Sequence, residues 1–317
     1  AIDYRCKKAF GNNLLFGGLQ VVLFGDPMQF PPIEEPLMYA RRKKYKEAHQ
    51  DKLWFFDFLP NAETIILKKQ YRQAESLRFT KFLGKIRLGE QTDQDLAWAN
   101  TRVAPVPEIA TVITHTNNDT DRINLNELKK LTGGKLPKPY RANYTGKFPD
   151  KERAQLPDRL YLAEGARVMI TMNDTKSSRY VNGSAGIVME LGEEFIVVQL
   201  DNGRIVDIEK NTLSHNKQIP FREGGRTVLK YHVAGTMTNY PLKLAWSWTA
   251  HKAQGQTLEN IYLKLPVFDK KPVEALIYSA LSRVMSMEGI QLFTPLTHED
   301  IKVNQKALKW LKSKDEC

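Results

Sequence analysis

Short apolar runs rich in β-branched residues alternate with helix-like stretches along this chain, and this alternation most limits what it can fold into. The run at 19–24 (LQVVLF) is continuous, which predicts a strand buried on both faces, as in a parallel sheet. We expect further strands at 63–68, 110–114, 241–246, 260–265 and 289–293, and helices at 38–52, 76–88, 119–131 and 272–284. This order of elements predicts an α/β domain.

The texture changes between residues 160 and 233, where short alternating runs appear. They are separated by the turn pairs Asn182-Gly183, Gly192-Glu193 and Asn202-Gly203, which are hairpin signals. We therefore expect a small antiparallel β-barrel inserted into the α/β domain, with strands at 167–170, 185–189, 195–200 and 204–208. Residues 132–158 are rich in Gly, Pro, Lys and Arg, and predict a long irregular connection before it.

The charge balance of the 317 residues is basic, with 47 Lys and Arg against 36 Asp and Glu. Such a balance suggests a polyanionic partner such as nucleic acid, although solubility alone also explains it. The two cysteines, Cys6 and Cys317, have neither metal-ligand spacing nor a disulfide framework, so we expect a reducing, intracellular compartment. No apolar run approaches the length of a membrane span, and no membrane partner is expected.

Two motifs directly follow predicted strands. In GDPMQFPP (25–32), Gln29 could sense a γ-phosphate or hold an attacking water, because ligands of open parallel sheets bind beyond the carboxyl ends of the strands. An ordinary turn with an exposed glutamine explains the motif equally well. In QYRQ (70–73), Arg72 could be an arginine finger, although for this motif alone a surface arginine is the favoured interpretation.

Two further motifs lie around predicted helices. TAHKAQGQT (249–257) gathers a hydroxyl, an imidazole, an ammonium and an amide, and its Gly255 would let the backbone approach a ligand closely. These groups suit phosphate and base contacts, although a lone histidine is usually structural. In YSALSR (278–283), Arg283 is either a cation placed against the helix dipole or a second phosphate-sensing arginine.

The motifs GDPMQFPP, QYRQ, VNGSAG (181–186), TAHKAQGQT and YSALSR, in this order, resemble those of the Pif-type and RecD-like DNA helicases of superfamily 1B. The resemblance runs from Phe16 to Leu292. It implies a RecA-like P-loop NTPase fold, with ATP gripped between two RecA-like domains while single-stranded DNA crosses their top. Closing on ATP and opening after hydrolysis would move the strand, in the five-prime to three-prime direction.

The resemblance also implies roles for individual residues. On the nucleotide side are the γ-phosphate sensor Gln29 with its neighbours Gly25 and Asp26, the two arginines Arg72 and Arg283, and the coupling residues Gln254 and Gly255. On the strand side are Thr249, His251 and Lys252, together with Thr116, Asn117 and Asn182.

The same resemblance implies a domain plan and a set of ligands. Residues 1–60 would be the remnant of a first RecA-like domain, 61–159 with 239–317 a complete second one, and 160–238 an inserted SH3-like barrel. ATP and Mg²⁺ would be cofactors of the intact protein, with neither bound to this fragment. The expected partners are single-stranded DNA and forked or partial-duplex DNA, handled by a monomeric motor.

One departure from the family is large, because the phosphate-binding loop G-x-x-x-x-G-K-[ST] and the Asp-Glu pair for Mg²⁺ are both missing. The chain also lacks an initiator methionine. We therefore expect a fragment that starts downstream of these elements and has no ATPase activity by itself. Two alternatives remain: a non-catalytic nucleic-acid-binding module, and a motor that translocates without unwinding or acts on RNA, since the strand contacts would look the same.

Overall fold

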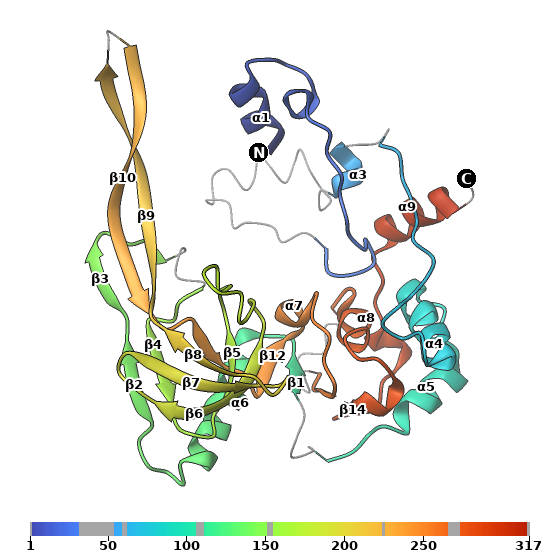
Figure 1. The fold of residues 1–317 in the computed structure, drawn as a ribbon. Helices are drawn as coiled ribbons and strands as arrows, with labels where there is room; N and C mark the ends of the chain where they lie inside the picture. The colour runs from blue at the N-terminus through green and yellow to red at the C-terminus, as the bar shows by residue number, and fades with distance from the viewer. Residues whose placement is uncertain are drawn as a thin grey trace, which may run out of the picture. The chain divides into compact units, whose positions relative to one another are not determined.

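The computed structural model describes residues 2–31, 54–58, 62–105, 111–150, 155–223, 226–265 and 273–315. It divides the chain into two compact units, one made of residues 1–67 with 303–317 and the other of residues 68–302 (Figure 1). The predicted helix at 38–52 lies outside the described residues.

The first unit is built from short helices: α1 (Ile2–Phe10), η1 (Leu15–Gly18), α3 (Phe55–Phe58) and α9 (Gln305–Asp315). The ring of Phe56 is stacked against Trp54 at 5.6 Å and against Trp310 at 4.9 Å between centroids. An ion pair of 2.9 Å between Lys306 and Asp57 adds a second link between α9 and α3. Aromatic stacking and this ion pair therefore join two segments far apart in sequence.

The predicted strands at 19–24 and 63–68 are wrong for this structure, since neither run is in a strand. Phe24 is 89% exposed and Leu67 82% exposed. A strand buried on both faces needs hydrogen-bonded neighbours and covering helices, and no described residue pairs with either run. Composition predicted a strand here, but a strand forms only where partners satisfy its backbone.

The second unit contains a parallel sheet of four strands in the order β12-β1-β13-β14. The strands are β1 (Thr111–Thr114), β12 (Ser247–Thr249), β13 (Ile261–Leu263) and β14 (Ile290–Leu292). The helices of this unit are α4 (Leu77–Leu88), α5 (Asp93–Asn100), α6 (Asn117–Leu131), α7 (Ala250–Ala253) and α8 (Leu276–Leu281), with short 3₁₀ turns η3 (Met287–Gly289) and η4 (His298–Asp300).

These positions confirm the predicted strands at 110–114, 260–265 and 289–293 and the helices at 76–88, 119–131 and 272–284, the last being shorter than expected. Local signals explain the two long helices. The buried face of α4 is formed by Phe79, Phe82, Leu83 and Ile86, at helical spacing, and Gly89 ends the helix in the left-handed conformation. Thr116 caps α6 by accepting a hydrogen bond from the backbone N–H of Asp119.

The predicted strand at 241–246 is only partly correct. Its first half is β11 (Leu242–Leu244), which pairs antiparallel with β5 (Arg167–Ile170). The parallel sheet gains its strand three residues later, at β12. The first half of this apolar run therefore belongs to the antiparallel sheet, and the chain enters the parallel sheet directly after the run.

The antiparallel part of the second unit has three sheets. Five strands in the order β11-β5-β6-β7-β8 include β6 (Ala185–Leu191), β7 (Phe195–Leu200) and β8 (Ile205–Glu209), as the alternating runs predicted. The other sheets contain β2 (Lys138–Arg141) with β4 (Arg159–Leu162), and β3 (Asn143–Gly146) with β10 (Arg226–Asn239) and β9 (Asn211–Glu223). Residues 132–158 are thus not irregular throughout, because β2 and β3 lie there.

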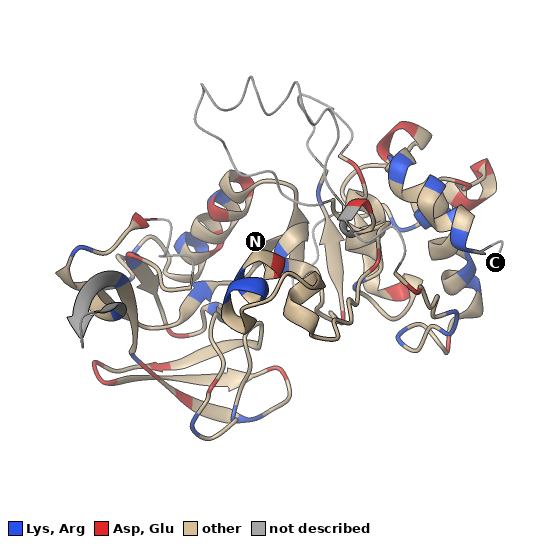
Figure 2. Cartoon of the chain, turned by 90° about the horizontal axis from the view of Figure 1, so that it is seen from above, with Lys and Arg blue, Asp and Glu red and all other residues tan. Residues whose placement is uncertain are grey.

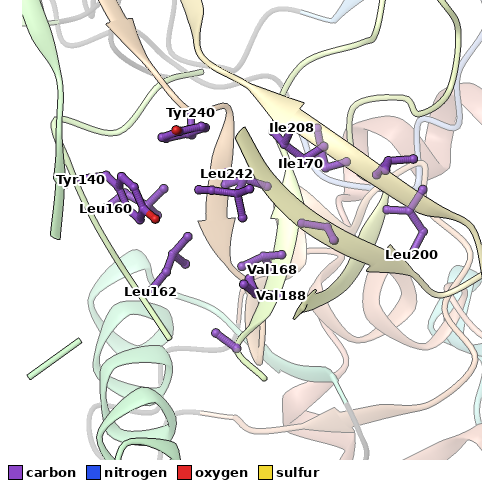
Figure 3. Close-up of a cluster of buried hydrophobic side chains, with 14 of the residues drawn as sticks. Tyr140, Leu160, Leu162, Val168, Ile170, Val188, Leu200, Ile208, Tyr240 and Leu242 are labelled. Carbon is purple, nitrogen blue, oxygen red and sulfur yellow. The ribbon is translucent and has the colours of Figure 1, made fainter. Parts of the chain in front are cut away.

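The core of this region is shared by the five-stranded sheet and the β2–β4 pair (Figure 3). Tyr140 and Tyr240 meet edge to face at 5.1 Å, and their hydroxyls donate to the carbonyls of Gly192 and Glu193 in the β6–β7 turn. Burial raises the pKa of Tyr240 to about 12. Among the described residues no pairing closes any sheet on itself, so an SH3-like barrel is not confirmed.

Candidate functional site

Three of the sequence motifs meet at Ser282. The Arg72 guanidinium donates from Nη1 to the Ser282 carbonyl at 2.7 Å and from Nε to the Thr257 hydroxyl at 2.9 Å. Arg283 donates from Nη2 to the Ser282 hydroxyl at 2.6 Å and from Nε to the Ser279 carbonyl at 2.9 Å. All four acceptors are neutral oxygens, so none of these four bonds is an ion pair. We call Arg72, Thr257, Ser282 and Arg283 the arginine cluster.

Gln73 supports the arginine cluster through buried hydrogen bonds. It is 5% exposed, and its amide donates to the Val284 carbonyl at 2.7 Å and to the Ser282 carbonyl at 3.3 Å. Arg283 is only 2% exposed, whereas Arg72 is half-buried. The contact of Arg283 with the Ser279 carbonyl, in the last turn of α8, is the one that the helix-dipole interpretation describes. Its role as a phosphate sensor stays a prediction.

The residues that we predict to contact DNA follow two neighbouring parallel β-strands. Thr114 at the end of β1 lies in register with Thr249 at the end of β12. Thr116 and Thr249 then cap α6 and α7, so Asn117, His251 and Lys252 emerge at the same carboxyl edge of the sheet. His251 and Lys252 are exposed, while Thr249 is buried and its hydroxyl serves the cap. We call Thr116, Asn117, Thr249, His251 and Lys252 the strand-edge cluster.

Both basic and acidic side chains lie at this edge. Burial lowers the pKa of the His251 imidazole, and the charge of His115 lowers it further, although part of the ring reaches solvent. The pKa of Lys243 is also lowered, first by burial and then by the nearby ammonium of Lys252. Neighbouring basic groups therefore lower the pKa values of His251 and Lys243, while the Asp121 carboxylate raises that of Lys243.

The loop with Asn182 reaches the same region from the antiparallel sheet. Gly183 has a φ of +93°, and a Cβ there would lie 2.8 Å from Cδ of Gln256, so the loop packs directly on the TAHKAQGQT segment. Asp174 holds the loop by accepting from the backbone of Ser177 at 3.1 Å and from Nε of Arg179 at 2.7 Å. The Arg179 guanidinium keeps the pKa of the Asp174 carboxyl well below its usual range. Asn182 itself is exposed.

The segment from Thr249 to Thr257 therefore joins the strand-edge cluster to the arginine cluster. Gly255, near its middle, has a φ of +85°, which favours glycine, and a Cβ there would meet open space. Gln254 is exposed. The open position of Gly255 agrees with the expected close approach of a ligand, while coupling by Gln254 and Gly255 stays a prediction.

The GDPMQFPP motif lies in the first unit. Asp26 accepts from the N–H of Met28 at its side chain (3.0 Å) and from the N–H of Gln29 at its carbonyl (3.1 Å), which makes a tight turn with Pro27 inside. Met28 is buried, Gln29 is half-buried and Gly25 is exposed. An ordinary turn is the local structure, and a role of Gly25, Asp26 and Gln29 at a nucleotide stays a prediction.

Sequence reasoning missed Gln73, Gln256, Thr257 and Ser282 as parts of the site. All four stand inside the quoted motifs, but their contacts join residues far apart in the chain. Among the described residues no group of three or more His, Cys, Asp or Glu is placed to hold a metal ion. In the same part of the chain no helix is long and apolar enough to cross a membrane.

A parallel α/β sheet that carries arginines at one loop and basic and amide groups at its carboxyl edge fits the RecA-like class, and solved structures match it. Bacteroides Pif1 bound to ssDNA covers 99% of this chain at a TM-score of 0.75 and 28% identity, and the chain covers 72% of it. A structure of two Pif1 helicases at forked dsDNA gives a TM-score of 0.72 at 28% identity, with 99% of this chain and 70% of that one covered.

Curated relatives agree. The ATP-dependent DNA helicase Pif1 of Bdellovibrio bacteriovorus is 26% identical over 290 residues, which is 90% of this chain and 60% of that protein. The human ATP-dependent DNA helicase PIF1 is 29% identical over 300 residues, 90% of this chain and 42% of that protein. No family model matches the chain. The chain is thus a homologue of the Pif1 DNA helicases, as the motif order predicted, and spans about half the length of these two relatives.

Proposed function

We propose that this chain is part of an ATP-dependent DNA helicase that moves along single-stranded DNA in the five-prime to three-prime direction and unwinds duplex. The observation that carries the proposal is the single segment from Thr249 to Thr257, which links the strand-edge cluster to the arginine cluster. A motor needs such a link between nucleotide and strand. Relatives named ATP-dependent DNA helicases, and a Pif1 structure with ssDNA, support this reading.

In this function the arginine cluster would serve the nucleotide. Arg72 and Arg283 would stabilise the charge on the transferring phosphoryl group, and Gln29 would sense the γ-phosphate, with Gly25 and Asp26 beside it. ATP suits the arginines chemically, because a guanidinium group pairs with phosphate oxygens through two parallel hydrogen bonds. Hydrolysis of bound ATP would supply the free energy that drives movement along the DNA. Mg²⁺ would accompany ATP in the intact protein, but the described residues hold no group of three or more His, Cys, Asp or Glu for it, so no step here is routed through the metal.

The strand-edge cluster would hold the DNA. Lys252 and His251 would meet phosphates, Thr116 and Asn117 would offer hydroxyl and amide groups, and Asn182 would reach the strand from the neighbouring loop. The capping role of Thr249 suggests that this residue shapes the edge through α7. Gln254 and Gly255 would transmit conformational changes between the arginine cluster and the strand-edge cluster.

The remaining features belong to the same proposal. The antiparallel region from 160 to 238 would be an SH3-like insertion in a second RecA-like domain made of 61–159 and 239–317, and residues 1–60 would belong to a first one. The motor would be monomeric, act on forked and partial-duplex DNA, and work in an intracellular, reducing compartment. The 317 residues alone would lack ATPase activity, since no phosphate-binding loop is among them.

A second candidate is a nucleic-acid-binding module without ATPase activity. It is favoured by the strand-edge cluster, which shares no residue with the arginine cluster and needs no nucleotide. Within the described residues, Lys and Arg are interleaved with Asp and Glu (Figure 2), and a net charge of +11 suits either candidate.

The test uses the natural-length protein beside the 317-residue chain. ATP hydrolysis is measured with and without single-stranded DNA, and unwinding with partial duplexes that carry a five-prime or a three-prime tail. The proposal expects strand-stimulated hydrolysis and unwinding of the five-prime-tailed duplex by the natural-length protein only. Strand binding without hydrolysis in the natural-length protein would instead support the module, and turnover by the 317-residue chain would contradict its expected inactivity.

A further inference from the structure

The β3-β10-β9 sheet carries a pocket that shares no residue with either cluster. Its volume is about 430 Å³, within the range of small-molecule sites. Among its lining residues are three rings, those of Tyr144, Phe148 and His215, and two lysines, Lys147 and Lys217.

Two glycines explain why the chain forms this pocket. Gly146 of β3 pairs with Gly235 of β10, and Gly235 pairs in turn with His215 of β9, so the three lie in one row across the sheet. A Cβ on Gly235 would lie 2.6 Å from the carbonyl carbon of Lys147, which means that the backbone passes directly over β10 there. The N–H of Lys147 donates to the Ala234 carbonyl at 2.9 Å and fixes this crossing.

Because of this crossing, the next residue, Phe148, lies beside His215 of β9. Its ring lies 6.4 Å from His215 at 74° and 6.4 Å from Tyr144 at 53°, measured between centroids and planes. Neither pair is stacked in parallel, since the Phe148–His215 pair is edge to face and the Tyr144–Phe148 pair is tilted. The Tyr144 hydroxyl donates to Asp158 at 2.9 Å, which orients its ring.

Aromatic faces next to lysines are what single-stranded nucleic acid requires, because bases stack on the rings while ammonium groups meet the backbone phosphates. Lys147 and Lys217 are both exposed, whereas the three rings are half-buried. We propose that this pocket binds an unpaired nucleobase of single-stranded nucleic acid, with the base stacked on Phe148 and the flanking phosphates held by Lys147 and Lys217. This second contact goes beyond the strand-edge cluster, and rests on the proposed function only for the class of ligand.

The test is equilibrium binding of a fluorescent oligothymidylate to the 317-residue chain, followed by anisotropy. Loss of one base–ring stack predicts that Phe148→Ala binds about 5- to 150-fold more weakly. Phe148→Leu fills the same space without a ring and should show a similar loss, while Phe148→Trp should keep near-normal binding. Lys147→Ala and Lys217→Ala should each lower the slope of log affinity against log salt by about 0.7, whereas Lys129→Ala on α6 is the matched control and should not.

The outcomes separate the two proposals. Unchanged binding by Phe148→Ala, or full binding by Phe148→Leu, overturns the pocket. If Phe148→Ala does not fold, judged by its thermal unfolding, the Leu and Trp variants decide. If His251→Ala and Lys252→Ala weaken binding but the pocket variants do not, the proposed function stands and the pocket is overturned. If the pocket variants weaken binding but His251→Ala and Lys252→Ala do not, the pocket stands and the proposed DNA contacts of the strand-edge cluster are overturned. No binding of the oligonucleotide by the unmodified chain at low salt overturns the pocket, and the proposed function is then decided by the hydrolysis and unwinding assays of the natural-length protein.

Discussion

The Arg72 guanidinium donates a 2.7 Å hydrogen bond to the main-chain carbonyl of Ser282. The two residues come from motifs 210 positions apart, and the Ser282 hydroxyl meanwhile accepts from the neighbouring Arg283. One serine thus sets the positions of both predicted phosphate-sensing arginines. Any movement of α8 that shifts Ser282 would move both guanidinium groups together.

The first prediction separates the two clusters by function. In the natural-length protein, Arg283→Ala should abolish ATP hydrolysis while most DNA binding remains, because we propose that the arginine cluster serves the nucleotide. His251→Ala and Lys252→Ala should instead weaken strand binding. Rates of hydrolysis and dissociation constants for single-stranded DNA check this. Equal loss of both activities in all three variants would contradict the division of roles. Thermal unfolding serves as the control, since Arg283 is buried.

The second prediction concerns Gln73, which supports the arginine cluster through buried hydrogen bonds. Gln73→Leu leaves the Val284 carbonyl without its amide donor, and should lower the free energy of unfolding by about 1–3 kcal/mol. Urea unfolding of the 317-residue chain measures it. Gln70→Leu, the same substitution at an exposed position of the same motif, is the control. Equal effects of the two substitutions would show that Gln73 does not support the cluster.

The third prediction compares two glycines. Gly183→Ala forces a left-handed φ on alanine and places its Cβ against the Gln256 side chain, whereas Gly255→Ala imposes similar backbone strain in open space. Both should destabilise the chain by about 1 kcal/mol or more, and Gly183→Ala should cost slightly more, because the end of the Gln256 side chain must move. In urea unfolding, Gln256→Ala should recover only the extra loss of Gly183→Ala. No recovery would mean that the two side chains do not conflict.

The fourth prediction is a pH dependence of strand binding. Because burial and the charge of His115 lower the pKa of His251 from 6.5, the imidazole is neutral at pH 7. Phosphates would favour its protonated form, so affinity should rise as pH falls below 7, by at most about tenfold per pH unit for one proton. Titrations at constant ionic strength test this, and His251→Asn should remove the dependence. A dependence that survives in His251→Asn would point to another group.

The lowered pKa of His251 affects the free energy of unfolding in the opposite direction: stability falls as pH falls. The folded-state pKa of His251 lies below its unfolded value, so the unfolded chain takes up this proton first. The contribution of His251 to stability is therefore present above the unfolded pKa and is lost as pH falls through it toward the folded pKa. Binding titrations must stay in the range where thermal unfolding shows a folded chain.

Much of the local structure follows from the sequence alone. The helices α4 and α6 carry apolar residues at helical spacing, and Ser76 and Thr116 stand before their first residues. The strands β6, β7 and β8 alternate and are separated by the glycine turns at Gly192 and Gly203. Such features depend on neighbours a few positions away, so pattern predicts them. The order of the motifs likewise predicted the similarity to the Pif1 DNA helicases without any contact being known.

Tertiary structure decided where strands form and which motifs meet. Residues 19–24 have the composition of a buried strand, yet Phe24 is exposed, because a strand needs partners that composition does not supply. Arg72 reaches Ser282, Gly183 meets Gln256, and Phe148 crosses to His215 only because the folded sheets bring distant segments together. Local pattern predicted most helices and strands of the second unit and the resemblance to the Pif-type helicases, while packing between remote segments formed the two clusters and the pocket.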